Sequence, residues 1–135
     1  MKTSTLCIGA DIHKQDIVLR GIDKANGHEV LEHFRVTNTL PGAQSAVQII
    51  AAAATELGYD RLAIGWEATG MLWIPFHRYL STASLLQPFA LELICFNPKL
   101  IAKFKGSLDL RGRKDDARDA YDIAARVRFG ELPVS

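Results

Sequence analysis

Two short apolar segments, each followed by an acidic residue, constrain the fold of this chain more than any other feature. Residues 62–66 form an unbroken apolar run that ends at Glu67, which is the pattern of a central strand covered on both faces. Residues 5–11 predict a second buried strand, which ends at Asp11. Because such strands need helices on both faces of their sheet, the two segments predict an α/β domain.

Three strands at the start of the chain are predicted to form an antiparallel meander. Residues 16–23 and 28–38 follow the strand at residues 5–11, and Asn26-Gly27 between them is typical of a type I′ hairpin turn. Alternate side chains of the third strand share one face of the sheet, namely Val30, Phe34 and Val36.

Helices and strands alternate in the rest of the chain. Helical spacing, with prolines that suit a first turn and glycines that end a helix, predicts helices at residues 41–57, 75–80, 99–105 and about 115–129. A fifth strand is predicted at residues 91–96, and a polar loop at residues 106–113. Three meander strands followed by helix, strand, helix, strand and helix is the order of the ribonuclease H-like fold. The expected architecture is therefore a mixed five-stranded sheet with an antiparallel three-strand meander and flanking helices.

The composition is that of a single globular domain. The chain has 135 residues, of which 48% are hydrophobic and 23% charged. No apolar run approaches the roughly 20 residues of a membrane span, and the N-terminal run is too short for a signal peptide. Cys7 and Cys95 lie in apolar segments without a nearby second cysteine, which predicts reduced, buried thiols and no zinc site. We therefore expect a cytoplasmic protein that does not contact a membrane.

Four carboxylates are placed where they could converge on one point. Asp11 and Glu67 end strands, whereas Asp116 and Asp119 lie at the start of the last predicted helix, on its apolar side. Converging carboxylates repel one another unless a cation lies between them. Their hard oxygen ligands suit Mg²⁺, and two such ions can stabilise the attacking and leaving oxygens of a phosphodiester. The pattern predicts a site for one or two Mg²⁺ ions, with Mn²⁺ as a substitute.

Each acid also has an ordinary structural explanation. An aspartate at a strand end is often a turn residue, and acids in the first turn of a helix interact favourably with its dipole. His13 could contact phosphate, carry a proton or simply lie at the surface. Thr69 and Gly70 could offer a hydroxyl or backbone N–H groups to phosphate, or form a plain turn. For the tryptophans near Glu67, base stacking competes with core packing, which is favoured for Trp66.

The charge of the chain is unevenly distributed although its formal net value is only +1. Between residues 99 and 114 a single acid, Asp109, accompanies six basic residues: Lys99, Lys103, Lys105, Arg111, Arg113 and Lys114. A basic stretch beside a carboxylate cluster is typical of a nucleic-acid-binding surface. A solvated helix face followed by a loop is the alternative.

Five short motifs occur in order along the chain: IGADIHK, WEATG, FNPK, FKGS and KDDARDA, at residues 8–14, 66–70, 96–99, 104–107 and 114–120. Together they resemble the N-terminal DEDD domain of the insertion-sequence transposases related to the Piv/MooV invertases, which are also described as bridge-RNA-guided recombinases. The resemblance covers residues 6–133. It implies a RuvC-like fold in which Asp11, Glu67, Asp116 and Asp119 are the catalytic, metal-binding set. It also implies cleavage and rejoining of DNA strands during transposition of an insertion element.

The resemblance also implies partners and a second domain. The partners would be DNA, a structured guide RNA and further copies of the chain in a homo-oligomer. Family members continue into a domain with a serine nucleophile, so residues 1–135 are expected to form a single RuvC-like catalytic domain that cannot complete recombination by itself. The family commonly has threonine where this chain has Asp115.

Three rival functions stay open on the sequence. One is a stand-alone nuclease of the Holliday-junction type, and another is a non-catalytic module for nucleic-acid binding or assembly. The third is an actin-like ATPase, which also begins with a strand-end aspartate and a hairpin. This last class is disfavoured because the chain has no second glycine-rich phosphate loop.

Overall fold

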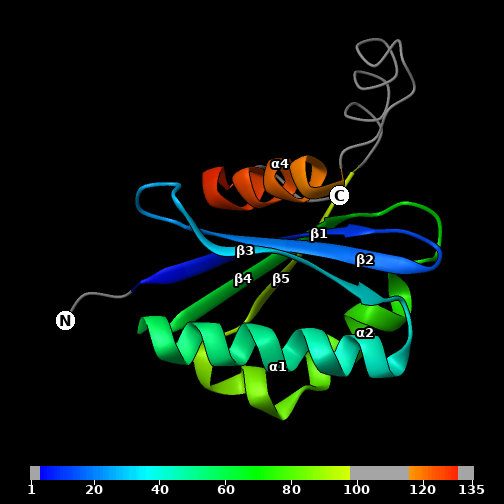
Figure 1. The fold of residues 1–135 in the computed structure, drawn as a ribbon, viewed down its shortest axis with the longest axis horizontal. Helices are drawn as coiled ribbons and strands as arrows, with labels where there is room; N and C mark the ends of the chain where they lie inside the picture. Colours follow the sequence, from blue (N-terminus) through cyan, green and yellow to red (C-terminus); the bar gives the residue numbers. More distant parts are fainter. Residues whose placement is uncertain (1–3, 98–115, 131–135) are drawn as a thin grey trace, which may run out of the picture.

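A mixed five-stranded sheet forms the centre of the computed structural model, which describes residues 4–97 and 116–130 (Figure 1). The strands lie in the order β3-β2-β1-β4-β5. Within this sheet β1 (Thr5–Ile12), β2 (Asp16–Asp23) and β3 (Glu29–Thr37) form an antiparallel meander. The strands β4 (Arg61–Glu67) and β5 (Glu92–Phe96) run parallel to β1. The predicted mixed sheet and its meander are confirmed.

Helices cover both faces of the sheet (Figure 1). On one face lie α1 (Leu40–Leu57), α2 (Ile74–Thr82) and the 3₁₀-helix η1 (Ser84–Phe89). On the other face lies α4 (Asp116–Phe129). The sequence did not predict η1, because a six-residue 3₁₀ segment is too short to show a helical period. The helix and loop predicted at residues 99–113 lie outside the described residues.

The ends of α1 follow the expected capping chemistry. The Thr39 hydroxyl accepts a 3.1 Å hydrogen bond from the Gly42 backbone N–H, and Pro41 occupies the first turn. Gly58 ends the helix in the left-handed conformation, with φ of 80°. The helix predicted at residues 41–57 is thus confirmed, with its first residue at position 40.

The predicted type I′ turn at Asn26-Gly27 is wrong. That turn requires a positive φ at both central residues, but of the two only Gly27 has one, at 75°. The connection from β2 to β3 is longer, because the Asp23 carboxylate accepts hydrogen bonds from the backbone N–H groups of Ala25 and Asn26, at 2.7 and 3.3 Å. These side-chain bonds stabilise a wider loop than a local dipeptide pattern indicates.

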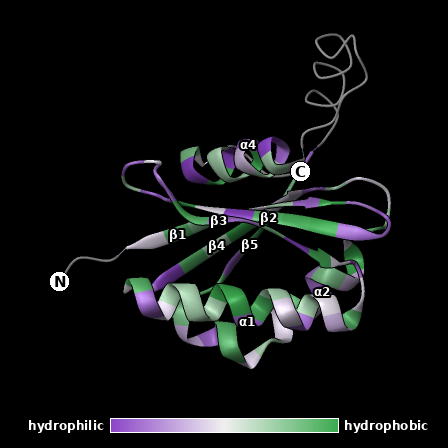
Figure 2. Cartoon of the chain, viewed as in Figure 1, coloured by the Kyte–Doolittle hydropathy of each residue, from purple (hydrophilic) through white to green (hydrophobic). Residues whose placement is uncertain are grey.

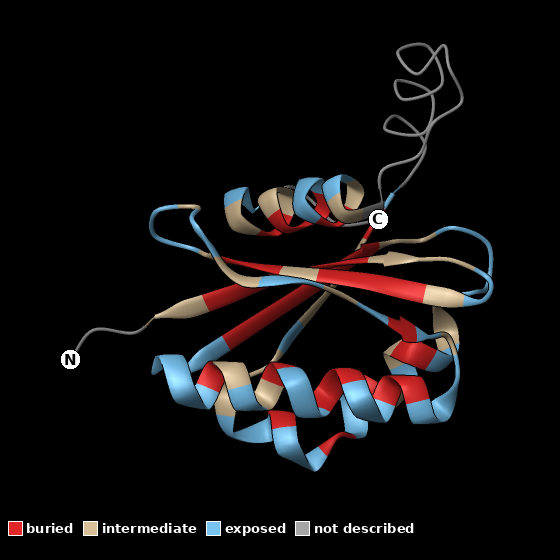
Figure 3. Cartoon of the chain, in the orientation of Figure 1, coloured by how far each residue is buried: buried red, intermediate tan, exposed pale blue. Residues whose placement is uncertain are grey.

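Buried side chains form two layers, one on each face of the sheet. The colours of Figures 2 and 3 mark hydrophobic and buried residues along the strands and on the helices that cover them. The larger layer lies between the sheet and α1 and includes Trp66 and Phe76, both almost completely buried. Core packing of Trp66 is therefore confirmed. The smaller layer lies under α4 and comprises Cys7, Ile22, Ala63, Phe96, Ile123, Ala124 and Val127.

The two cysteines are free thiols, as expected. Cys7 is completely buried, and this burial raises the pKa of its thiol to about 11. Cys95 is only partly buried, and its pKa is raised mainly by the same loss of solvation. Among the described residues, no helix is both long and hydrophobic enough to cross a lipid bilayer.

One prediction concerns the hydrogen bond that joins the end of β2 to the segment between α1 and β4. The Tyr59 hydroxyl donates to the Asp23 carboxylate at 2.7 Å, and this bond is the main reason why the pKa of Asp23 lies below its usual value. Tyr59→Phe is expected to cost about 1 kcal/mol of stability at pH 7. A depressed folded-state pKa stabilises the protein above the unfolded pKa of about 4, and that contribution is lost as the pH falls through the folded value.

The measurement is urea unfolding of the wild type and Tyr59→Phe as the pH is lowered from 7 to below 4. The gap in unfolding free energy between the two proteins should narrow at the acidic end. An equally wide gap at every pH would show that the lost packing of the hydroxyl, rather than its bond to the carboxylate, causes the effect.

Candidate metal centre

Two of the four predicted acids lie side by side at the carboxyl edge of the sheet. In the parallel register of β1 and β4, Ala10 is the partner of Trp66, so Asp11 and Glu67 follow next to each other. Gly9 and Gly65 face α4, because a Cβ atom on either would meet atoms of that helix. Side chains two residues apart on a strand share a face, so both acids also face the α4 side.

The start of α4 lies toward the same edge. Near its end, Arg128 donates to the backbone carbonyls of the β2–β3 connection, which lies beside the start of β1. Its middle, at Ala120 and Ala124, lies directly over Gly9. The helix therefore runs antiparallel to β1, and its first turn lies toward the end of β1 (Figure 1).

This placement brings the start of α4, with its two acids, toward the strand acids. Asp119 is partly buried in the turn before Ala120, whereas the Asp116 side chain is outside what the structure describes. Among the side chains that the structure describes, which do not include Asp116, no three from His, Cys, Asp or Glu are grouped closely enough to hold a metal ion. The described structure thus places Asp11 beside Glu67, at the ends of neighbouring strands, and leaves the four-acid site untested.

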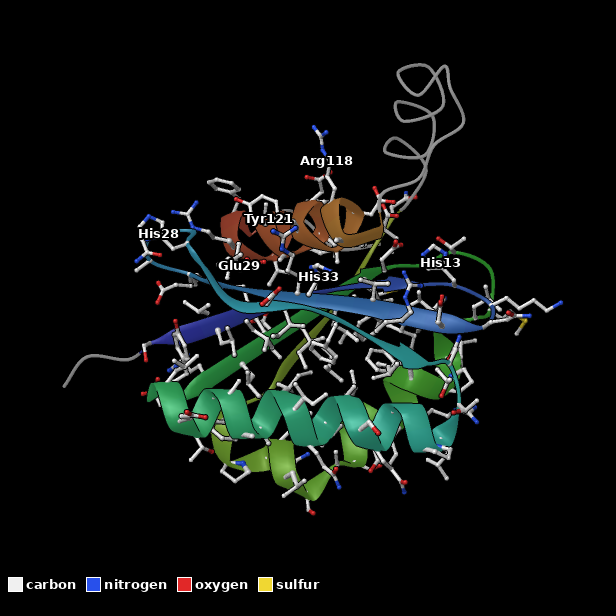
Figure 4. All side chains as sticks on the ribbon, in the orientation of Figure 1. His13, His28, Glu29, His33, Arg118 and Tyr121 are labelled. Atoms are coloured by element: carbon white, nitrogen blue, oxygen red, sulfur yellow. The ribbon has the colours of Figure 1, made fainter. Side chains whose placement is uncertain are left out.

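His13 lies against Asp11 rather than simply at the surface. Its Nε2 atom is 2.8 Å from Asp11 Oδ2, and the two side chains are 27% and 13% exposed. The loop that carries His13 is fixed by the Asn38 side-chain amide, which donates to the His13 carbonyl at 2.9 Å. Figure 4 shows His13 at the opposite end of the sheet from His28.

Arg126 on α4 forms an ion pair with Glu67, and sequence reasoning missed it. Its Nη1 atom donates to Glu67 Oε2 at 3.1 Å, and the two side chains are only 11% and 15% exposed. The guanidinium carbon also lies 4.3 Å from the centre of the Phe96 ring. The available signal was spacing, because Arg126 follows Asp119 by seven residues and so lies on the same side of the helix.

The segment after β4 is a tightly bonded turn. The Ala68 and Thr69 N–H groups donate to the carbonyls of Phe96 and Glu67, at 2.8 and 2.9 Å. These N–H groups are therefore engaged by the protein, contrary to the idea that Thr69 offers its backbone N–H to phosphate. The Trp73 indole also closes the turn, by donating to the Gly70 carbonyl at 3.0 Å.

The ligand atoms of the described acids suit the expected ion, although the described acids alone are not grouped closely enough to hold it. Asp11 and Glu67 offer carboxylate oxygens, which are the ligands preferred by Mg²⁺ and Mn²⁺. The six basic residues predicted to bind nucleic acid lie outside the described part of the chain, as does Asp115.

A family model with the description "Transposase", DEDD_Tnp_IS110, matches residues 8–135 of the chain. No curated protein gives a significant match.

Among solved structures, similar chains include three proteins of low identity. The polyphosphate/ATP-glucomannokinase of Arthrobacter sp. strain KM has 16% identity and a TM-score of 0.34, with 71% of this chain and 44% of that one covered. A Ppx/GppA family member from Aquifex aeolicus has 11% identity and a TM-score of 0.37, with 68% and 35% covered. The ethanolamine utilization protein EutJ from Carboxydothermus hydrogenoformans has 15% identity and a TM-score of 0.38, with 78% and 40% covered. The chain thus spans less than half of each structure, and likenesses at these TM-scores carry no argument about function.

Proposed function

The chain belongs to the IS110-type family of DEDD transposases, and from this premise we propose that it is the metal-binding catalytic domain of a DNA recombinase. In this proposal it cleaves and rejoins DNA strands during the transposition of an insertion element. The observation that carries the proposal is the placement of Asp11 and Glu67 on neighbouring parallel strands, at one edge and on one face. If each acid had only its own structural role, there would be no reason for the two to lie side by side on the same face of the sheet.

We further propose that the fold is ribonuclease H-like, of the RuvC type. The support is the strand order β3-β2-β1-β4-β5 with only β2 antiparallel to the other strands, together with helices on both faces. In this fold an acid on the first strand, an acid on a central strand and acids on a late helix face one metal site. That arrangement corresponds to Asp11, Glu67 and the first turn of α4.

The four acids have distinct proposed roles in this site. Asp11 would be the central ligand, Glu67 would hold the ion from the neighbouring strand, and Asp116 and Asp119 would complete the site from α4. When bound, Mg²⁺ or Mn²⁺ supplies Lewis-acid stabilisation of a phosphodiester. His13, bonded to Asp11, orients that carboxylate.

The proposed partners are DNA, a structured guide RNA and further copies of the chain. The six basic residues between Lys99 and Lys114 would contact the phosphates of the nucleic acid. The serine-bearing second domain of the family would complete recombination.

A direct test of the site is calorimetric titration of the chain with Mn²⁺. Asp11→Asn is expected to weaken binding by at least about tenfold, because it removes one negative charge next to a divalent ion. Asp116→Asn should act in the same direction. Asp23→Asn is the matched control, since it makes the same change at the opposite end of the sheet and should leave the affinity unchanged. Equal affinity in the wild type and Asp11→Asn would rule out Asp11 as a ligand.

A second candidate function has one observation in its favour. Asp11 and Glu67 each have a protein partner, His13 and Arg126, as expected of acids with a purely structural role. The chain would then be a non-catalytic nucleic-acid-binding module. In that case charge reversal at Lys103 and Lys105 would weaken DNA binding, whereas Asp11→Asn would change neither DNA binding nor Mn²⁺ binding.

A further inference from the structure

The ion pair between Arg126 and Glu67 connects two elements that are far apart in the sequence. It joins the second half of α4 to the carboxyl end of β4, and both side chains are largely withdrawn from solvent. Most ion pairs at protein surfaces contribute little, but a pair this well covered is screened far less by water and salt. Arg126 therefore contributes a positive charge beside Glu67.

Glu67 needs such a neighbour because another carboxylate lies next to it. Asp11 follows the same register on the adjacent strand and faces the same side. Two neighbouring carboxylates repel each other, and a cation beside one of them relieves this repulsion. A guanidinium and a divalent ion can therefore both satisfy Glu67, but they repel each other when both are close to it.

We propose that Arg126 is a positioning residue of the metal centre, which holds Glu67 in place before metal binds and opposes the entry of the ion. This inference rests on the function proposed above. When a divalent ion binds Glu67, Arg126 moves away from Oε2. Arg126 thereby lowers the affinity of the site for metal while it stabilises the metal-free protein.

Phe96 gives the guanidinium a second partner during this exchange. It is the register partner of Glu67 on β5 and is completely buried, and its ring lies 4.3 Å from the guanidinium carbon. A cation over an aromatic face is stabilised even without a carboxylate. Arg126 can thus leave the Glu67 oxygen and keep its contact with the ring, so the exchange needs no movement of α4.

The test compares Arg126→Met and Arg126→Gln with the wild type, in Mn²⁺ calorimetry and in thermal unfolding with EDTA. Both variants should bind Mn²⁺ about tenfold more tightly, the effect expected when one unit charge about 6 Å from a divalent ion is removed in a water-like dielectric. In EDTA both should unfold at a lower temperature than the wild type. The glutamine variant keeps a donor for Glu67 and provides a second measurement if the methionine variant folds poorly.

Arg128→Met is the matched control. It removes the same charge from the same helix, but Arg128 bonds the carbonyls of Lys24 and Ala25 at the far end of the sheet. It should lower the unfolding temperature and leave the Mn²⁺ affinity within about twofold of the wild type. An arginine with a purely structural role at position 126 would behave like Arg128.

The outcomes distinguish a failure of this inference from a failure of the proposed function. Tighter binding in the Arg126 variants, lost again when Asp11→Asn is added, supports the inference even if the wild type binds too weakly to measure. The wild type could bind Mn²⁺ in a way that depends on Asp11 while the Arg126 variants bind it equally or more weakly. That result would overturn the inference but leave the proposed function standing. Absence of Asp11-dependent binding in every variant would overturn both.

Discussion

Replacing Gly9 with alanine is expected to lift α4 from the sheet while the opposite layer stays folded. A Cβ atom at this position would lie 2.1 Å from the Ala120 carbonyl oxygen and 2.3 Å from the Ala124 backbone nitrogen. Because these are backbone atoms within a helix, they cannot rotate away as a side chain can. The expected loss of stability is about 3 kcal/mol, at the upper end of the usual cost of overpacking.

Hydrogen exchange together with chemical unfolding would measure this effect. In Gly9→Ala the amides of α4 should lose their protection, whereas those of α1, on the other face, should keep it. Gly58→Ala is the control: its φ of 80° is strained for alanine, but apart from the adjoining residues no atom lies within 4 Å of the added Cβ. Normal protection of α4 in Gly9→Ala would contradict this prediction. It would show that the helix moves slightly away from β1 but stays packed on the sheet.

The Gly9 contact also matters for the proposed activity. The helix that packs over Gly9 is α4, which carries Asp116 and Asp119. The distance between α4 and the sheet therefore sets the distance between these two acids and the two acids on the strands. Gly9, two residues before Asp11, thus helps to assemble the site without contacting a ligand. Gly9→Ala should therefore weaken Mn²⁺ binding as well as stability.

The second large effect is expected from Asp11→Asn in metal-dependent DNA strand cleavage. If Asp11 is the central ligand, the variant should lose about a thousandfold in rate, since metal ions supply several kcal/mol of transition-state stabilisation. The assay would follow nicking and joining of plasmid DNA by this domain together with the serine-bearing domain that the family resemblance implies. Glu67→Gln should behave in the same way.

The fold should survive both changes, because asparagine and glutamine keep the shape of the acids they replace. In Asp11→Asn the new amide can still bond to His13, and in Glu67→Gln the new amide oxygen can still accept from Arg126. Asp23→Asn is again the matched control and should reduce stability without reducing cleavage, since Asp23 bonds Tyr59 far from the site. Full cleavage by folded Asp11→Asn would remove the basis for a DEDD mechanism in this chain.

The local patterns of the sequence predicted most of the secondary structure. The apolar runs before Asp11 and Glu67 predicted the central strands, and Pro41 with Gly58 predicted the limits of α1. These predictions succeeded because strand burial and helix capping depend on residues within a few positions of one another. The prediction of a type I′ turn between β2 and β3 was wrong because hydrogen bonds to the Asp23 side chain compete with the local preference of Asn26-Gly27.

Only the tertiary structure determined which groups meet. Arg126 and Glu67 are 59 residues apart, and their contact depends on where α4 crosses the sheet and in which direction it runs. That crossing depends in turn on the space above Gly9 and Gly65, which a one-dimensional pattern does not record. The sequence by itself determined which residues could carry metal chemistry, whereas the packing of α4 determined that an arginine lies beside one of them, because contacts between distant segments follow from how whole elements fit together.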